Sequence, residues 1–159
     1  MGQAEQLAFE KLKTELCRAT DESLVIVDFG KLFTIHVDSS NHTIGSYLTQ
    51  PDVNQKERPV AFITKKPNKT QQAWSTIEKE TFATIWALGH FRNRIFGKPM
   101  TVFTDHNPIT YLTEAVPKSA KLMRWALAIQ QHDVTFRYKA GKANVVADCL
   151  SRIDQEVAE

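Results

Sequence analysis

Three stretches in the first half of the chain have the hydrophobic pattern of strands. Within 31–38, the apolar residues Phe33, Ile35 and Val37 alternate with polar residues, a pattern typical of a half-buried strand. Residues 43–49 (TIGSYLT) and 59–64 (PVAFIT) are two more strand-like segments, separated by the polar run QPDVNQKER. Because the connections are short, we expect these three strands to form an antiparallel meander.

The second half of the chain has mainly helical periodicity. Ser75-Thr-Ile-Glu78 matches the S/T-x-x-E capping box, and the apolar residues that follow predict a helix over 76–93. The apolar pattern also predicts strands at 100–104 and 134–138, helices at 5–18, 118–131 and 144–153, and a short helix that begins at Asn107. This order of elements predicts an α/β domain in which helices cover a five-stranded mixed sheet. Trp74, Trp86 and Trp125 are expected in its core.

The composition fits one domain of ordinary size. The chain has 159 residues, of which 42% are hydrophobic and 24% charged, enough apolar residues to build a core. No apolar run approaches the roughly 18 residues that span a bilayer, and the first residues do not resemble a secretory signal. Two cysteines cannot form a disulfide framework. We therefore expect an intracellular, cytoplasmic protein that is not secreted and has no membrane partner.

Basic residues are concentrated in two blocks, although the net charge is only +2. Residues 58–98 hold eight basic and two acidic side chains, and residues 118–142 hold six basic side chains and one acidic side chain. Blocks of this kind suit a polyanion bound through its phosphates. Solvated helix faces of a near-neutral protein would give the same pattern, so charge alone leaves both interpretations.

Four acidic residues stand where strands end or helices begin: Asp38, Glu80, Asp105 and Asp148. If the first and fourth strands are neighbours, Asp38 and Asp105 lie side by side, and two helices could add the other acids. Carboxylates in one cleft suit Mg²⁺ or Mn²⁺, and two such ions about 3.5–4 Å apart promote phosphodiester hydrolysis. Acids at these positions are also common for turn and helix-dipole reasons.

Several longer motifs make the choice more specific. The strings HVDSSNHTIGSYLTQ, WSTIEKETFATIWALGHFR, FTDHNPITYL and RWALAIQQHDVTFRYKAGKANVVADCLSR occur in this order. Together they resemble the ribonuclease H domain of gypsy-type LTR retrotransposon reverse transcriptases, and the resemblance covers residues 29–152. It implies a ribonuclease H-like fold with a connector at 1–30, the domain at 31–153 and an acidic tail at 154–159.

The resemblance also implies a function. The domain would cleave the RNA strand of RNA/DNA hybrids in a retroelement particle, with two Mg²⁺ ions and Mn²⁺ as a substitute. Its partners would be the hybrid and the polymerase region of the reverse transcriptase in cis. A catalytically inactive ribonuclease H-like domain, structural or nucleic-acid-binding, is the alternative. A transposase or integrase on the same fold is disfavoured, because it needs a Glu on the last helix where this chain has Asp148.

Residue by residue, the family's metal-binding acids fall on Asp38, Glu80, Asp105 and Asp148. Glu78 is expected to complete the capping box, which leaves Glu80 as the metal ligand. Tyr138 stands where many other ribonucleases H have a His. Of the five histidines only His106, next to Asp105, is a candidate for the cleft edge, and it could also be an ordinary polar residue at a strand end. The expected substrate contacts are Ser39, Ser40, Asn41, Ser75, Thr76, Asn107 and Tyr138.

Overall fold

The computed structural model describes residues 6–7, 9–11, 13–14, 27–95, 97–105, 119–140 and 143–152. The short helix expected at Asn107 lies outside these residues, as do Cys17, the tail at 154–159 and much of the helix expected at 5–18. Within the described part of the chain, no helix is long and apolar enough to cross a membrane.

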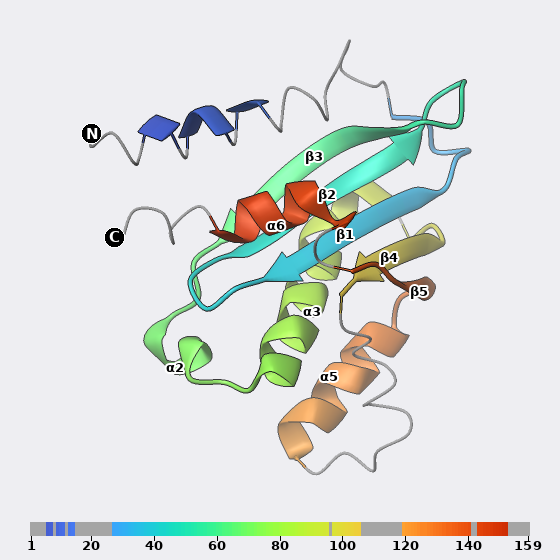
Figure 1. Ribbon diagram of the computed structural model, residues 1–159. Coiled ribbons are helices and arrows are strands. Elements are labelled where there is room, and N and C mark those ends of the chain that lie inside the picture. Colours follow the sequence, from blue (N-terminus) through green and yellow to red (C-terminus); the bar gives the residue numbers. More distant parts are fainter. Residues whose placement is uncertain are drawn as a thin grey trace.

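One five-stranded sheet forms the centre of the domain, with the strand order β3-β2-β1-β4-β5 (Figure 1). Its strands are β1 (Phe33–Ser39), β2 (Ile44–Pro51), β3 (Glu57–Lys65), β4 (Met100–Thr104) and β5 (Val134–Tyr138). The first three pair antiparallel, whereas β4 runs parallel to β1 and β5 runs parallel to β4. The mixed sheet and the meander expected from the hydrophobic pattern are therefore confirmed.

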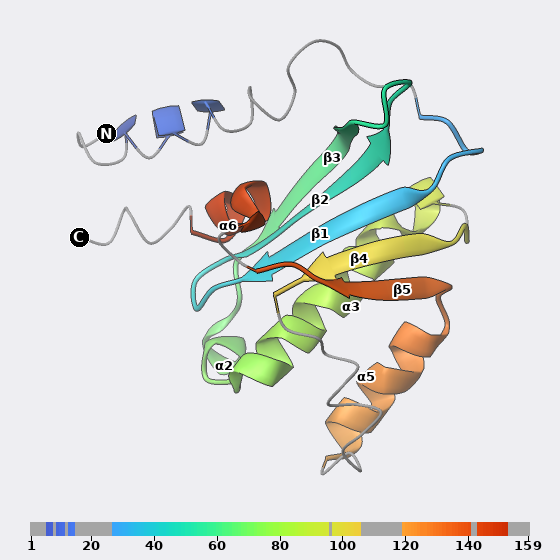
Figure 2. The ribbon, with the colours of Figure 1, turned by 45° about the vertical axis from the view of Figure 1, so that its right-hand side comes forward.

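Helices cover both faces of the sheet. The long helix α3 (Thr76–Ile95) and α5 (Ala120–Gln130) lie on one face, and α6 (Val145–Arg152) lies on the other (Figure 2). Buried residues of β1, such as Phe33 and Ile35, share the main hydrophobic core with Leu88 and Phe91 of α3. A smaller cluster beneath α6 contains Tyr47, Ala147 and Leu150.

Strand β1 is more buried than its alternating pattern predicts. His36, on the polar side of the pattern, has no exposed surface. Its ring stacks on Tyr47 at 4.3 Å and on Phe103 at 5.2 Å between centroids, and its Nε2 lies 3.0 Å from Glu57 Oε2. Helix α3 therefore covers one face of β1, while α6 and side chains of the neighbouring strands cover the other.

The hydrophobic pattern misses the four-residue helix α2 (Lys69–Gln72). Asn68 and Gln71 form a capping box at its start, with the Gln71 N–H donating to Asn68 Oδ1 at 2.8 Å. A single turn is too short to carry a periodic signal.

The prediction that all three tryptophans lie in the core is wrong in part, because each is only half-buried. Trp86 packs against the main core, and Trp74 and Trp125 contact each other at 5.3 Å between ring centroids. These two rings lie beneath Lys121, which belongs to α5. A cation over their faces explains why they stay near the surface.

Candidate active site

Three of the four expected acids meet at one end of the sheet. Asp38 lies near the end of β1, Asp105 directly follows β4, and Glu80 lies in the first turns of α3. One carboxylate oxygen of each lies within 4.8 Å of those of the other two. Among the described residues this group, which we call the acid triad, is the arrangement best suited to a metal ion.

The topology explains why these side chains converge. Strands β1 and β4 are parallel neighbours, with His36 opposite Phe103, so the residues that follow emerge at the same edge of the sheet. Helix α3 packs against β1 and places Glu80 over that edge. Acids separated by up to 67 positions in the sequence are thus brought together by one strand pairing and one helix packing.

The surroundings of Glu80 disfavour its ionised form. Glu80 is only 3% exposed, and burial raises its pKa to about 8. A hydrogen bond from Ser39 works against this increase, whereas the charges of Asp105 and Asp38 add to it. A bound cation would neutralise this repulsion and favour the ionised form of Glu80.

The hydrogen bonds of Glu80 also fit a metal ligand. The Ser39 hydroxyl donates to Glu80 Oε1 at 2.6 Å. The second oxygen, Oε2, is buried and has no hydrogen-bond partner among the described residues. A buried carboxylate oxygen in this condition is costly unless a ligand satisfies it, so the donor set is suited to a hard divalent cation.

Asp148, the fourth expected acid, lies apart from the triad. It is half-buried in the first turn of α6, and its carboxylate is not part of the group of atoms within 4.8 Å. Helix α6 packs on β1 and β2, so it approaches the triad from the opposite face of the sheet to α3. The role of Asp148 as a metal ligand stays a prediction.

Two serines connect α6 to the strand that carries Asp38. The hydroxyl of Ser151 on α6 donates to Asp38 Oδ2, and the hydroxyl of Ser40 donates to the backbone carbonyl of Ser151. The Ser40 hydroxyl oxygen also accepts hydrogen bonds from the His42 and Thr43 N–H groups, which fixes the β1–β2 turn. Sequence reasoning assigned no role to Ser151, although its position three residues after Asp148 puts both on one side of α6.

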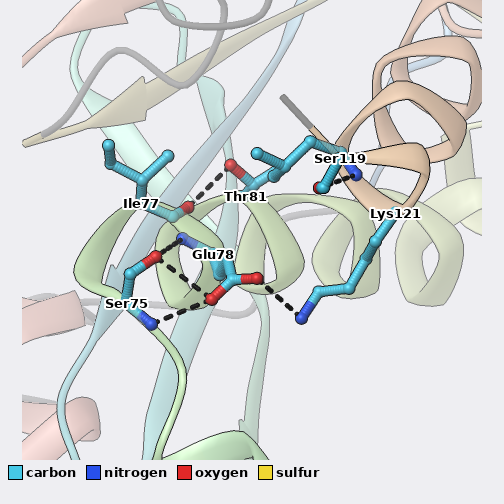
Figure 3. A network of polar contacts seen from close by, with 7 residues as sticks. Ser75, Ile77, Glu78, Thr81, Ser119 and Lys121 are labelled. Atoms are coloured by element: carbon cyan, nitrogen blue, oxygen red, sulfur yellow. Dashed lines mark hydrogen bonds and ion pairs between the residues drawn. The ribbon is translucent and has the colours of Figure 1, made fainter. Parts of the chain in front are cut away.

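Glu78 has the capping role expected from the sequence. Its Oε2 accepts a hydrogen bond from the Ser75 N–H at 3.0 Å, and its own N–H points to Ser75 Oγ at 3.4 Å. Its Oε1 pairs with Lys121 Nζ of α5 at 2.8 Å (Figure 3). The hydrogen bond from Lys121, and those from Ser75 in the capping box, hold the pKa of Glu78 below its ordinary value. Glu78 therefore stays charged and outside the acid triad.

Three of the other expected substrate contacts lie at or near the same end of the sheet. Asn41 is exposed and accepts a hydrogen bond from Lys79 Nζ at 2.7 Å. Thr76 is exposed at the start of α3, and Tyr138, at the end of β5, is 68% exposed. Asn107 and His106 lie outside the described residues.

The sequence matches a known family and several curated relatives. Residues 28–132 match the model of the "RNase H-like domain found in reverse transcriptase". The chain is 40% identical over 151 residues to the Pol polyprotein from transposon opus, and 43% identical over 148 residues to that from transposon 412, both of Drosophila melanogaster. These alignments cover 94% and 93% of the chain but only 15% and 12% of the relatives. The chain thus spans a small part of the length of the polyproteins it matches.

Solved structures share the fold at lower sequence identity. A foamy viral protease-reverse transcriptase in complex with double-stranded DNA matches 74% of this chain and 25% of its own, with a TM-score of 0.63 and 17% identity. The ribonuclease H1 LC11, in complex with an RNA/DNA hybrid, matches 79% of this chain and 99% of its own, with a TM-score of 0.54 and 16% identity.

Proposed function

Because the chain belongs to the family of RNase H-like domains found in reverse transcriptases, we propose that it hydrolyses the RNA strand of RNA/DNA hybrids. The observation that carries this proposal is the acid triad, with carboxylate oxygens of Asp38, Glu80 and Asp105 within 4.8 Å of one another. A cluster of three acids, of which Asp38 and Glu80 are buried, is costly for stability. Bound cations would offset this loss of stability, and they would also serve the reaction.

Asp38, Glu80 and Asp105 would hold two Mg²⁺ ions, for which Mn²⁺ is a plausible substitute, and Asp148 would complete the set. When bound, such ions supply an activated water and stabilise the leaving oxygen of a phosphodiester. The chain's own groups orient these ligands. Ser39 fixes one oxygen of Glu80, and the buried position of Glu80 keeps bulk water away from its carboxylate.

The proposed substrate contacts are polar side chains that follow the strands or begin the helix carrying the triad. Lys79 and Asn41 form an exposed pair that adjoins Glu80 and Asp38 in the sequence, and a phosphate could replace Asn41 as the partner of Lys79. Ser40, Ser75, Thr76, Asn107 and Tyr138 are the remaining proposed contacts. Recognition of the hybrid would depend on its shape and its 2′-hydroxyls rather than on base edges.

The setting of this activity follows from the relatives. They are transposon polyproteins of which the chain covers a small part, so we propose that the polymerase region of the reverse transcriptase acts in cis, in a cytoplasmic retroelement particle. Residues 1–30 would connect the two regions. An inactive ribonuclease H-like domain is the second candidate, and the position of Asp148 outside the triad is the observation that favours it.

A gel assay on a hybrid with labelled RNA tests the proposal. The protein should cleave the RNA in Mg²⁺, should not cleave it in EDTA, and should leave the same RNA intact when it is single-stranded. Glu80→Gln should abolish cleavage, whereas the matched variant Glu78→Gln, two residues away on the same helix, should retain most of it because Gln also completes a capping box.

Asp38→Asn should behave like Glu80→Gln, since its charge is part of the same triad. A folded protein that binds the hybrid but leaves it intact in both Mg²⁺ and Mn²⁺ would establish the inactive alternative. Cleavage that survives Glu80→Gln but not Glu78→Gln would show that the two glutamates have been assigned in the wrong order.

A further inference from the structure

Ser151 occupies an unusual position beside the acid triad. It has no exposed surface, and its hydroxyl donates to Asp38 Oδ2 across 113 positions of sequence. The same oxygen lies 2.9 Å from the carbonyl of Asp148 in its own helix. A hydroxyl has one hydrogen, and an ionised carboxylate is the stronger acceptor, so Asp38 takes the bond.

Contacts with β2 and β1 fix the backbone of α6, which carries Ser151. Gly45 of β2 lies under α6, where a Cβ would come 2.5 Å from Leu150 Cβ, 2.7 Å from the Ala147 carbonyl oxygen and 2.8 Å from the Ser151 nitrogen. At the start of α6, the buried Asn144 side chain donates to the Val37 carbonyl at 3.2 Å. Ser151 therefore has little freedom to move relative to β1.

We infer that Ser151 is a positioning residue that holds the Asp38 carboxylate in the orientation required to bind the metal ions. One oxygen of Asp38 is held by a rigid donor from α6, which sets the plane of the carboxylate and thereby the direction of the other oxygen. Asp38 is 6% exposed, so water has little access to replace the lost bond. The inference rests on the proposed function for the need for metal, but its test does not depend on cleavage.

Partners that orient a metal-binding carboxylate typically change metal affinity or activity by about 10- to 100-fold when they are removed. The test is therefore Mn²⁺ binding to the full chain without nucleic acid, measured by titration calorimetry. Ser151→Ala should weaken Mn²⁺ binding by about tenfold or more, and a higher Mg²⁺ concentration should recover part of its cleavage rate.

Ser46→Ala is the matched control. Ser46 also has no exposed surface, and its hydroxyl also makes a buried hydrogen bond, to the His36 carbonyl at 2.8 Å. Ser46→Ala should therefore lose stability to a similar extent but keep the Mn²⁺ affinity of the original chain. Equal loss of affinity in both variants would mean that Ser151 acts only through stability, and it would overturn the inference.

Ser151→Cys covers the case in which Ser151→Ala does not fold. A thiol nearly preserves the shape of the side chain but is a weak donor, so this variant should fold and still bind Mn²⁺ more weakly. Unchanged affinity in a folded Ser151→Cys or Ser151→Ala variant would overturn the inference while wild-type cleavage stands. Absence of Mn²⁺ binding by the original chain would instead refute the proposed function, and the inference with it.

Discussion

The first turns of α3 and the whole of α6 both carry expected metal ligands, but they are attached to the domain in opposite ways. At α3, charged side chains make the connection: Glu78 caps the helix and pairs with Lys121, which lies 3.8 Å above the Trp74 ring. At α6, the contacts are buried and involve neutral donors: Ser151 and Asn144 donate to β1, and Gly45 admits the helix backbone.

This difference indicates which end of the site tolerates change. Ion pairs near the surface contribute modestly and weaken in salt, whereas a close backbone contact has no flexible part that can adjust. We therefore expect the stability of the α3 end, which also carries Glu80, to depend on pH and salt. The α6 end should respond to changes in shape and hardly at all to solution conditions.

The largest effect should come from Glu80 in the metal-free protein. Its pKa is raised from 4.5 to about 8, so between these pH values the folded state holds a proton that the unfolded state has lost. Stability from this group then falls as pH rises, by about 1.4 kcal/mol per pH unit at the steepest. Glu80→Gln removes this loss.

Urea unfolding in EDTA from pH 4 to 9 measures this difference. The Glu80→Gln variant should match the original chain near pH 4 and become more stable towards pH 8, with Mg²⁺ closing the gap for the original chain. Parallel stability curves at all pH values would show that Glu80 is not a buried, strained acid.

The second prediction concerns the close contact between α6 and Gly45 of β2. Gly45→Ala forces a Cβ into backbone and Cβ atoms at 2.5–2.8 Å, which should cost about 1–3 kcal/mol. Gly89→Ala, inside α3 with no atom within 4 Å of the new Cβ, should instead stabilise by about 0.5–1 kcal/mol.

Urea unfolding compares the two alanine variants at low and high salt. If the two variants change the free energy of unfolding in opposite directions, and salt does not alter these changes, then close steric contact holds α6 against β2. A Gly45→Ala protein as stable as the original would mean that α6 sits farther from β2 than the close contacts require.

The third prediction concerns the positive charge of Lys121, which pairs with Glu78 at the start of α3. Lys121→Met keeps an apolar stem but loses the ion pair to Glu78 and the contacts with Trp74 and Trp125, at 3.8 and 5.0 Å from the ring centroids. We expect a loss of about 1 kcal/mol at low salt. Because the charge is partly exposed, the loss should shrink in 1 M NaCl, and a salt-independent loss would assign it to packing.

The smallest effect should come from Glu78→Gln. The capping bonds survive, so only the charge attraction to Lys121 is lost, about 0.5 kcal/mol. The Glu78 pKa lies below its ordinary value, so this contribution is present at neutral pH and disappears as pH falls through the lowered pKa. A double-mutant cycle with Lys121→Met measures it, and a coupling of zero would contradict the pairing.

The sequence predicted the features that depend on local pattern. Alternation predicted β1, two strand-like segments predicted β2 and β3, and the capping box predicted the start of α3. The resemblance distinguished Glu80 from Glu78, whose capping role the structure confirms. The sequence made the meeting of Asp38 and Asp105 conditional on β1 and β4 being neighbours, and the structure fulfils this condition.

Features that depend on distant partners could not be predicted. Ser151 resembles any small helical residue in the sequence, because its acceptor is 113 positions away. Trp74 lies between α2 and α3, and the lysine over its ring belongs to α5, 47 positions further along the chain. The position of Asp148 depends on how far α6 slides along the sheet, which no local rule specifies.

The attachment of α6 also has a consequence for the order of folding. Its bonds to β1 close loops of 107–113 residues, and the chain entropy lost in such closures must be offset before the contacts stabilise anything. The sheet and α3 can therefore condense first, with α6 docking late. Late contacts govern how fast a protein unfolds rather than how fast it folds, so the hydroxyl that orients Asp38 also belongs to the step that sets the lifetime of the native state.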